Sequence, residues 1–238
     1  MRVNKTLLKP TLLGLLLTIL LSTQAIFAIP TTFVADYSVA KGSMTLGNLH
    51  TSLKVSGNRY SYQKYTKATG LAALITGIKI TENTNGQVSG HSIRPNNYLL
   101  NKSQRKKSKI DKIQFSGSNA NGNYQGKSYK MSISDNTQDR ASLELVLARD
   151  VALNKPQLSY PVVERGVKKQ YTFQKLGNEK TQTPAGTFNT VKVKVIRSGN
   201  KRETIFWLAK ETDYMPVKIR HREKGDVITT VLKNYKKT

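Results

Sequence analysis

Short stretches in which every second residue is apolar run through most of this chain, and Gly, Asn or Pro interrupts them repeatedly. This period-two alternation is typical of antiparallel strands that bury one face and expose the other. Segment 188–196 is an example, because its valines fall on one side while Lys192 and Lys194 point away. The pattern predicts a mainly β protein.

The alternation marks individual strands and the connections between them. Strands are expected at 32–39 and 59–65, and a four-strand meander at 188–196, 204–209, 216–221 and 227–235. Residues that tolerate positive φ predict hairpin turns at Asn85-Gly86, Asn121-Gly122, Gly177-Asn178, 198–200 and 224–226. The Ser-, Asn- and Gly-rich stretch 117–126 is predicted to be a long hairpin loop, with a hinge between two domains as the alternative.

Two segments depart from this β pattern. Asp139 can cap a helix that runs to Leu153, and Pro156 follows the end of that helix. Its leucines and valines share one stripe, so we expect the helix to pack against a sheet face. The apolar segment 70–78 is expected to be either a short helix or a lid loop.

These elements predict a curved antiparallel sheet or a partly closed β-barrel with one packed α-helix. We expect residues 29–238 to form a single antiparallel β domain, since about 210 residues suffice for one large core.

The first 28 residues have the order of a secretory signal peptide. Three basic residues precede an apolar run at 11–21, and small residues follow up to Ala28. The run is about half the roughly 20 residues that a membrane-spanning helix needs, so we expect cleavage and no transmembrane segment afterwards. The expected location is the periplasm or the exterior of the cell.

Charge and cysteine content limit the partners and the chemistry. The chain has no cysteine, which excludes disulfides and thiolate sites. It has 39 basic and 14 acidic residues, and removal of the signal leaves a net charge of about +22. We therefore expect an anionic lipid, lipopolysaccharide or an acidic envelope partner, or else a charge that serves solubility alone. Nucleic acid is not expected, because no recognition helix or stacking platform is evident.

No catalytic or metal-binding pattern is found. His50, His91 and His221 lie far apart in the sequence without ligand spacing. The carboxylate candidates are Glu82, Asp135, Asp139, Glu144 and Asp150, and structural roles are favoured over catalysis. Asp139 is interpreted as a helix cap, and Glu144 and Asp150 as solvated helix residues. There is no nucleophile elbow and no phosphate-binding loop. We expect no catalytic residue, no metal, no cofactor and no enzymatic activity, with an envelope hydrolase as the last alternative.

The sequence favours a non-enzymatic binding or chaperone-like protein for an amphiphilic anionic envelope ligand. Tyrosines on a strand and a neighbouring apolar patch can bound a cavity, and the candidates are Tyr60, Tyr62, Leu71, Leu74 and Ile75. The other interpretation of the apolar patch is that it completes the core without a cavity. The alternative is a basic envelope interaction protein that binds lipopolysaccharide or an acidic protein without a cavity. Its contacts would come from the cluster at 102–112, through Arg105, Lys106, Lys107 and Lys109. That cluster is otherwise a solvated loop before a strand at 110–115.

Several short motifs occur in an order that resembles the domain-of-unknown-function family 3108 of exported bacterial proteins. They are Phe33–Tyr37, 57–62, Arg94-Pro95 with Tyr98, the helix beginning at Asp139, 183–191, Ile205–Ala209 with Trp207, and 214–217. The resemblance implies one exported antiparallel β domain and no established activity. The sheet-plus-helix pattern is also similar, at fold level, to half-barrel carriers that shuttle lipoproteins between membranes. Structural roles are expected for Gly186 in a turn, Trp207 in the core and Pro216 at a strand start.

Overall fold

The computed structural model describes residues 30–199 and 201–238. The predicted signal peptide, residues 1–28, lies outside the described residues. The first half of the sheet contains β1 (Phe33–Lys41), β2 (Met44–Ser56), β3 (Arg59–Ala68), β4 (Lys79–Ser89), β5 (Ser92–Gln104), β6 (Lys107–Ser116), β7 (Asn119–Tyr124) and β8 (Lys127–Ser132). The second half contains β9 (Leu158–Glu164), β10 (Val167–Thr183), β11 (Gly186–Ile196), β12 (Arg202–Ala209), β13 (Pro216–Glu223) and β14 (Asp226–Lys237).

All 14 strands belong to one sheet, in the order β8-β7-β6-β5-β4-β3-β2-β1-β14-β13-β12-β11-β10-β9. Each strand pairs antiparallel with its neighbours, and the first and last strands pair in the middle, with Phe33 opposite Lys237. The predicted curved antiparallel sheet is therefore confirmed, as is the C-terminal meander, which corresponds to β11–β14.

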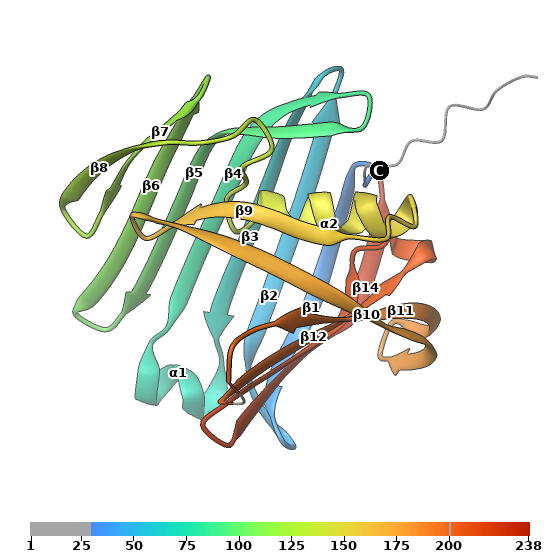
Figure 1. Cartoon of the computed structure of the whole chain (residues 1–238). Coiled ribbons are helices and arrows are strands. Elements are labelled where there is room, and N and C mark those ends of the chain that lie inside the picture. The colour runs from blue at the N-terminus through green and yellow to red at the C-terminus, as the bar shows by residue number, and fades with distance from the viewer. Residues whose placement is uncertain (1–29, 200) are drawn as a thin grey trace, which may run out of the picture.

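The two halves of the sheet face each other across the helix α2 (Ser142–Ala152) (Figure 1). The edge strands β8 and β9 are not paired with each other, but contacts link the two ends of the sheet. The Lys168 ammonium donates to the Ser132 carbonyl at 3.0 Å, and Gln138 forms an isolated parallel bridge with Val162. The sheet is thus curved, and these contacts link its two ends without closing it by strand pairing.

Helix α2 starts as the sequence predicts. One carboxylate oxygen of Asp139 accepts the backbone N–H groups of Ala141 and Ser142, both at 2.8 Å. Nine of the 11 helix residues are buried, so the helix is enclosed by both halves rather than packed on one stripe. The buried core on both sides consists of aromatic and branched side chains, among them Phe33, Tyr62 and Val193.

The prediction of a hairpin turn was wrong at three places. Asn85-Gly86, Asn121-Gly122 and Gly177-Asn178 lie inside β4, β7 and β10. A Cβ atom on Gly86 would lie 2.0 Å from the Arg94 carbonyl oxygen, and the register shifts at this point and again between Lys175 and Gly177. Glycine here permits close strand approach and β-bulges, which bend the sheet instead of reversing the chain.

Other local predictions have mixed outcomes. Segment 117–126 is not a long loop, because β7 occupies residues 119–124 between two tight turns. Segment 70–78 contains the short helix α1 (Gly70–Thr76), and residues 210–212 form the 3-10 helix η1 (Lys210–Thr212). Trp207 is buried and Pro216 begins β13, as predicted. Across residues 30–199 and 201–238, no helix has the length and apolar character needed to cross a membrane.

Candidate functional site

A chain of alternating charges runs beneath α2 and connects the two halves of the sheet. Lys64 on β3 pairs with Glu144 on α2 and lies 3.7 Å from Glu82 on β4. Arg140, just before α2, then bridges Glu82 at 3.9 Å and Glu164 on β9 at 3.8 Å. Lys169 on β10 pairs with Glu164 at the far end. Each carboxylate therefore has a basic partner from another element.

Each of these three carboxylates also accepts a tyrosine hydroxyl. Tyr62 donates to Glu144 at 3.0 Å, and Tyr98 donates to Glu82 at 2.7 Å. Tyr171 donates to Glu164 at 3.2 Å. The arrangement satisfies the buried oxygens on both sides of the helix, as buried charge requires.

The local environment shifts the acidities of these groups. Burial by itself would raise the pKa of Glu82, but the attraction of Lys64 and Arg140 overcomes it and holds the pKa below its ordinary value. The pKa of Glu164 is lowered in the same way: burial opposes the shift, and Lys169 and Arg140 outweigh it. Both side chains are therefore ionised at neutral pH.

Burial also corrects two interpretations of the α2 carboxylates. Glu144 is not a solvated residue, because its side chain is only 18% exposed within the charge chain. Asp150 is buried as well, and it pairs with Arg149 at 2.6 Å and Lys155 at 3.0 Å while accepting the Tyr160 hydroxyl at 3.1 Å. The sequence did not reveal the partners of Glu144, because Tyr62 and Lys64 lie about 80 positions away along the chain. Tyr160, a partner of Asp150, lies ten positions away on another element.

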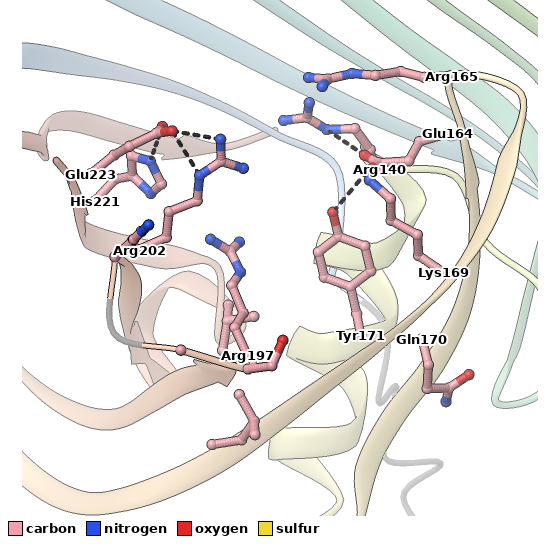
Figure 2. Close-up of a pocket in the computed structure, with 15 residues that line it drawn as sticks. Arg140, Glu164, Arg165, Lys169, Gln170, Tyr171, Arg197, Arg202, His221 and Glu223 are labelled. Atoms are coloured by element: carbon pink, nitrogen blue, oxygen red, sulfur yellow. Dashed lines mark hydrogen bonds and ion pairs between the residues drawn. The ribbon is translucent and has the colours of Figure 1, made fainter.

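Where the charge chain reaches β9 and β10, the structure opens into a cavity of about 820 Å³. We call it the cationic mouth; its wall contains six basic and two acidic residues: Arg140, Arg165, Lys169, Arg197, Lys201, Arg202, Glu164 and Glu223. Figure 2 shows the Arg197 side chain pointing into the space between the Arg202–Glu223 pair and the Tyr171–Glu164 pair. The electrostatic field in this space favours an anion.

A second cavity of about 330 Å³ continues from the mouth toward α2. The two share Arg140, Tyr171, Val195, Arg197 and His221 in their walls. We call this second space the apolar floor, because its remaining wall is largely hydrophobic: Leu143, Leu147, Phe173, Phe206 and Ile219. Phe173 and Phe206 meet edge to face, with ring centroids 6.1 Å apart.

The order of side chains along four strands produces this change from apolar to charged. Residues two apart share a face of a strand. Phe173, Tyr171 and Lys169 therefore follow one another along β10, and Val195, near the end of β11, is followed two residues later by Arg197 just past the strand. The same progression runs through Phe206, Thr204 and Arg202 on β12 and through Ile219, His221 and Glu223 on β13. This period-two signal was present in the sequence and was missed there.

The structure does not bring together the five residues of the predicted cavity. Tyr60 and Tyr62 are 3% and 1% exposed and point into the core, whereas Leu71, Leu74 and Ile75 are exposed on α1. β3 continues for six residues past Tyr62, or roughly 20 Å at about 3.3 Å per residue, and this length carries α1 to the edge of the sheet.

The predicted basic contact residues lie together on an exposed hairpin. Arg105 and Lys106 form the turn between β5 and β6, and Lys107 and Lys109 lie on β6. β6 begins at Lys107 rather than at residue 110, so the cluster is a hairpin end and not a loop.

Comparison with solved structures shows a similar fold. A β-barrel-like protein of the domain of unknown function DUF1849 from Brucella abortus superimposes with a TM-score of 0.54 at 6% identity, covering 87% of this chain and 98% of that chain. A candidate exported protein with a YmcC-like fold from Bacteroides fragilis gives a TM-score of 0.34 at 9% identity, covering 88% and 98%. The TM-score of 0.54 indicates a shared architecture with the DUF1849 protein, and at 6% identity that likeness carries no function.

No curated protein matches this sequence. The model of one family, described as a protein of unknown function (DUF3108), matches residues 33–233. The motifs at Phe33–Tyr37 and 214–217 both lie within that match. The chain therefore belongs to the DUF3108 family.

Proposed function

We propose that this chain is an exported, non-enzymatic protein that binds an amphiphilic anionic ligand between α2 and strands β10–β13. The observation that carries this function is the direct continuation of the apolar floor into the cationic mouth. A ligand with a hydrocarbon part would place it against Phe206 and Leu147, and its anionic head would meet the arginines of the mouth. Pockets for small ligands commonly combine a largely apolar wall with a few charged groups in this way.

The charges of the mouth favour an anionic head group. Among the described residues, Arg165 and Arg197 form no ion pair, whereas Arg140 and Arg202 are each paired with glutamate. An unpaired guanidinium offers two parallel N–H donors, which match a carboxylate or a phosphate. The head group of the ligand would therefore be one of these two, held first by Arg197.

The buried acids support binding rather than catalysis. Glu82, Glu144 and Glu164 each have both a basic partner and a tyrosine donor, so none is poised to exchange a proton with a substrate. A structural role in holding the two halves of the sheet together accounts for all three.

One arrangement in the mouth could serve a hydrolase, which is the alternative. The Thr204 hydroxyl and His221 Nδ1 are 2.8 Å apart, and His221 Nε2 lies 3.5 Å from Glu223. Thr204 is only 7% exposed, however, and it lies inside β12, opposite His221 in the β12–β13 ladder. Acyl transfer also requires free donors for the developing oxyanion, and a paired strand offers few.

Head-group preference provides the decisive experiment. Mature protein is titrated by calorimetry with dodecyl phosphate, dodecanoate, dodecanol and dodecyltrimethylammonium, which share one chain length and differ in charge. We expect the two anions to bind and the cation not to bind. Arg197→Gln should weaken anion binding about tenfold, and Phe206→Asp should abolish it, while the exposed Lys210→Gln serves as the control. Equal binding of the cation, or no effect of either cavity variant, would overturn the function.

Two further measurements address export and the alternatives. Intact mass of the protein recovered from the periplasmic fraction should correspond to a chain that begins near Ile29 or Pro30. Native mass spectrometry of the same sample identifies any ligand that it carries.

Hydrolysis of p-nitrophenyl esters that disappears in His221→Ala would favour the hydrolase. Binding of lipopolysaccharide that persists in Phe206→Asp would favour the surface interaction without a cavity.

A further inference from the structure

Exposed apolar side chains gather at one edge of the sheet. Because neighbouring strands alternate in direction, the connections β1–β2, β3–β4, β5–β6, β7–β8, β9–β10, β11–β12 and β13–β14 all fall on the same edge. Eight large hydrophobic residues are exposed in the described part of the chain, and six of them lie at this edge: Met44, Leu71, Leu74, Ile75, Val167 and Ile196. Such a concentration differs from the scattered exposure of an ordinary surface and indicates an interaction site.

Helix α1 contributes the largest part of this exposed surface. Leu71, Leu74 and Ile75 are spaced i, i+3 and i+4, so they project from one face of the helix, and they are 63%, 79% and 58% exposed. The helix is held to the sheet by its flanks: Thr69 N–H donates to the Leu46 carbonyl at 3.0 Å, and Ala68 N–H donates to the Ile78 carbonyl at 2.9 Å. Its apolar face therefore stays presented outward.

The β5–β6 hairpin lies directly beside this helix. The Arg105 guanidinium donates to the Leu74 carbonyl at 3.4 Å, so the tip of the basic hairpin contacts α1. Figure 1 shows both at the lower edge of the first half of the sheet. Exposed basic side chains surround the helix: Lys67, Lys79, Arg105, Lys106 and Lys107. Segments 67–79 and 102–109 contain no Asp or Glu, so the charge is not neutralised locally.

We propose that α1 and the β5–β6 hairpin dock this protein on the surface of an anionic lipid bilayer. An apolar helical face flanked by basic side chains suits the boundary between head groups and acyl chains, where the hydrocarbon is buried and the bases meet lipid phosphates. The seven residues of α1 extend only about 10 Å at 1.5 Å per residue, so the helix lies in the interface and does not span it.

Docking on a bilayer is a property separate from ligand binding in the cavity. The docking surface and the opening of the cavity nevertheless lie at the same edge of the sheet. Arg197 directly follows the end of β11 and Arg202 begins β12, so these two arginines of the cationic mouth lie at the same edge of the sheet as α1. A bilayer bound at this edge would lie on the side where the mouth opens. The site that holds the ligand and the surface that holds the bilayer share no residue, so each is tested separately.

Vesicle sedimentation tests the docking surface with the mature protein. Vesicles of phosphatidylethanolamine and phosphatidylglycerol at 3:1 should sediment the protein, and vesicles of phosphatidylcholine should not. Leu71→Ser/Leu74→Ser/Ile75→Ser should weaken binding to the anionic vesicles at least about tenfold. Tyr65→Ser/Leu176→Ser removes two other exposed hydrophobics, 41% and 44% exposed, and should leave binding unchanged.

Two double variants with the same change in net charge distinguish binding through this surface from attraction by the net charge of the whole protein. Lys106→Glu/Lys107→Glu should reduce vesicle binding about tenfold or more. Lys54→Glu/Lys236→Glu changes the net charge equally at exposed positions away from this edge, so it should have a smaller effect. Equal losses in the two pairs would show that net charge alone drives association, and retention of binding by the triple serine variant would overturn the role of α1.

Because the chain has no cysteine, a single label can report insertion directly. An environment-sensitive dye on Leu74→Cys should shift its emission to shorter wavelength with anionic vesicles, and the same dye on Leu176→Cys should not. An unshifted dye at residue 74 contradicts insertion. Binding of dodecyl phosphate without vesicles is measured on every docking variant. If a variant retains dodecyl phosphate binding while it loses vesicle binding, the cavity and the docking surface are distinct sites. If dodecyl phosphate does not bind the wild type while the vesicle results hold, ligand binding fails and docking stands.

Discussion

Asp111 on β6 accepts the backbone N–H of Arg165, at the turn between β9 and β10, at 2.7 Å. The two residues lie in opposite halves of the sheet, 54 positions apart in the sequence. Asp111 is 1% exposed, and its other carboxylate oxygen accepts the Tyr129 hydroxyl at 3.4 Å. The contact holds the two ends of the sheet together where no strand pairing joins them.

Removal of this contact should open the sheet at its edge. Asp111→Ala leaves a buried N–H without an acceptor, and we expect a loss of about 1–3 kcal/mol in the free energy of unfolding. Asp111→Asn retains an acceptor and should lose less. Urea denaturation measures both, and hydrogen exchange at Arg165 should accelerate in the alanine variant. An alanine variant as stable as wild type would show that the closure is incidental.

Lys64 should be the most sensitive member of the charge chain, because its side chain is only 14% exposed and faces two glutamates. Lys64→Met leaves Glu144 without its partner, and we expect a loss of about 2–4 kcal/mol in the free energy of unfolding at pH 7. Lys64→Met/Glu144→Gln removes the unpaired charge and still accepts the Tyr62 hydroxyl, so it should recover part of that loss. A double variant no more stable than the single one would contradict this account.

The cost of Lys64→Met should also depend on pH. The lowered pKa of Glu82 means that this carboxylate stabilises the fold above its unfolded pKa and loses that contribution as the pH falls through its lower folded pKa. The difference in the free energy of unfolding between wild type and Lys64→Met should therefore be largest near pH 7 and should become smaller below about pH 4. Urea midpoints between pH 3 and pH 7 measure this difference, and an equal cost at both ends of that range would argue against ion pairing.

Asp139 should have the opposite pH dependence. Burial raises its pKa from 3.8 to about 6, although Thr84, Ser142 and Ala141 donate hydrogen bonds to it. The folded state holds this proton more tightly than the unfolded chain, so its contribution to stability is complete below about pH 4 and is lost as the pH rises through about 6. The loss is on the order of 3 kcal/mol.

A neutral amide at residue 139 should remove this dependence. Asp139→Asn can still cap α2, and its stability relative to wild type should improve between pH 4 and pH 7. Urea unfolding at several pH values measures the change, with the exposed Asp135→Asn as the control; the Asp135 side chain is 75% exposed. A constant difference between Asp139→Asn and wild type across this range would refute the buried ionisation.

Gly86 should tolerate no side chain, in spite of its place in an ordinary-looking Asn-Gly pair. An added Cβ would lie 2.0 Å from the Arg94 carbonyl oxygen and 2.8 Å from the Tyr60 ring. We expect Gly86→Ala to lower the free energy of unfolding by about 3 kcal/mol or more. Gly90→Ala, at a turn with open space around it, should cost about 1 kcal/mol. Similar losses in both variants, measured by thermal unfolding, would contradict the close approach.

The strands and the start of α2 could be predicted from the sequence because their causes are local. Alternation at 188–196 follows from the two-residue period of a strand, and Asp139 caps a helix whose first N–H groups are two and three residues away. The glycine pairs were misassigned for the same reason. A local rule treats Asn85-Gly86 as a turn, whereas the opposing strand makes it a bulge.

The candidate site depended on the tertiary structure. The alternation along β10–β13 contained a signal for the mouth, since Arg197 continues the face of Val193 and Val195. By contrast, the charge chain joins residues separated by as many as 82 positions, such as Tyr62 and Glu144. By itself, the sequence determined which residues alternate, cap and carry charge. The curvature and register of the sheet decided which of them meet, because contacts between distant strands depend on the whole network of pairings and not on the residues beside them.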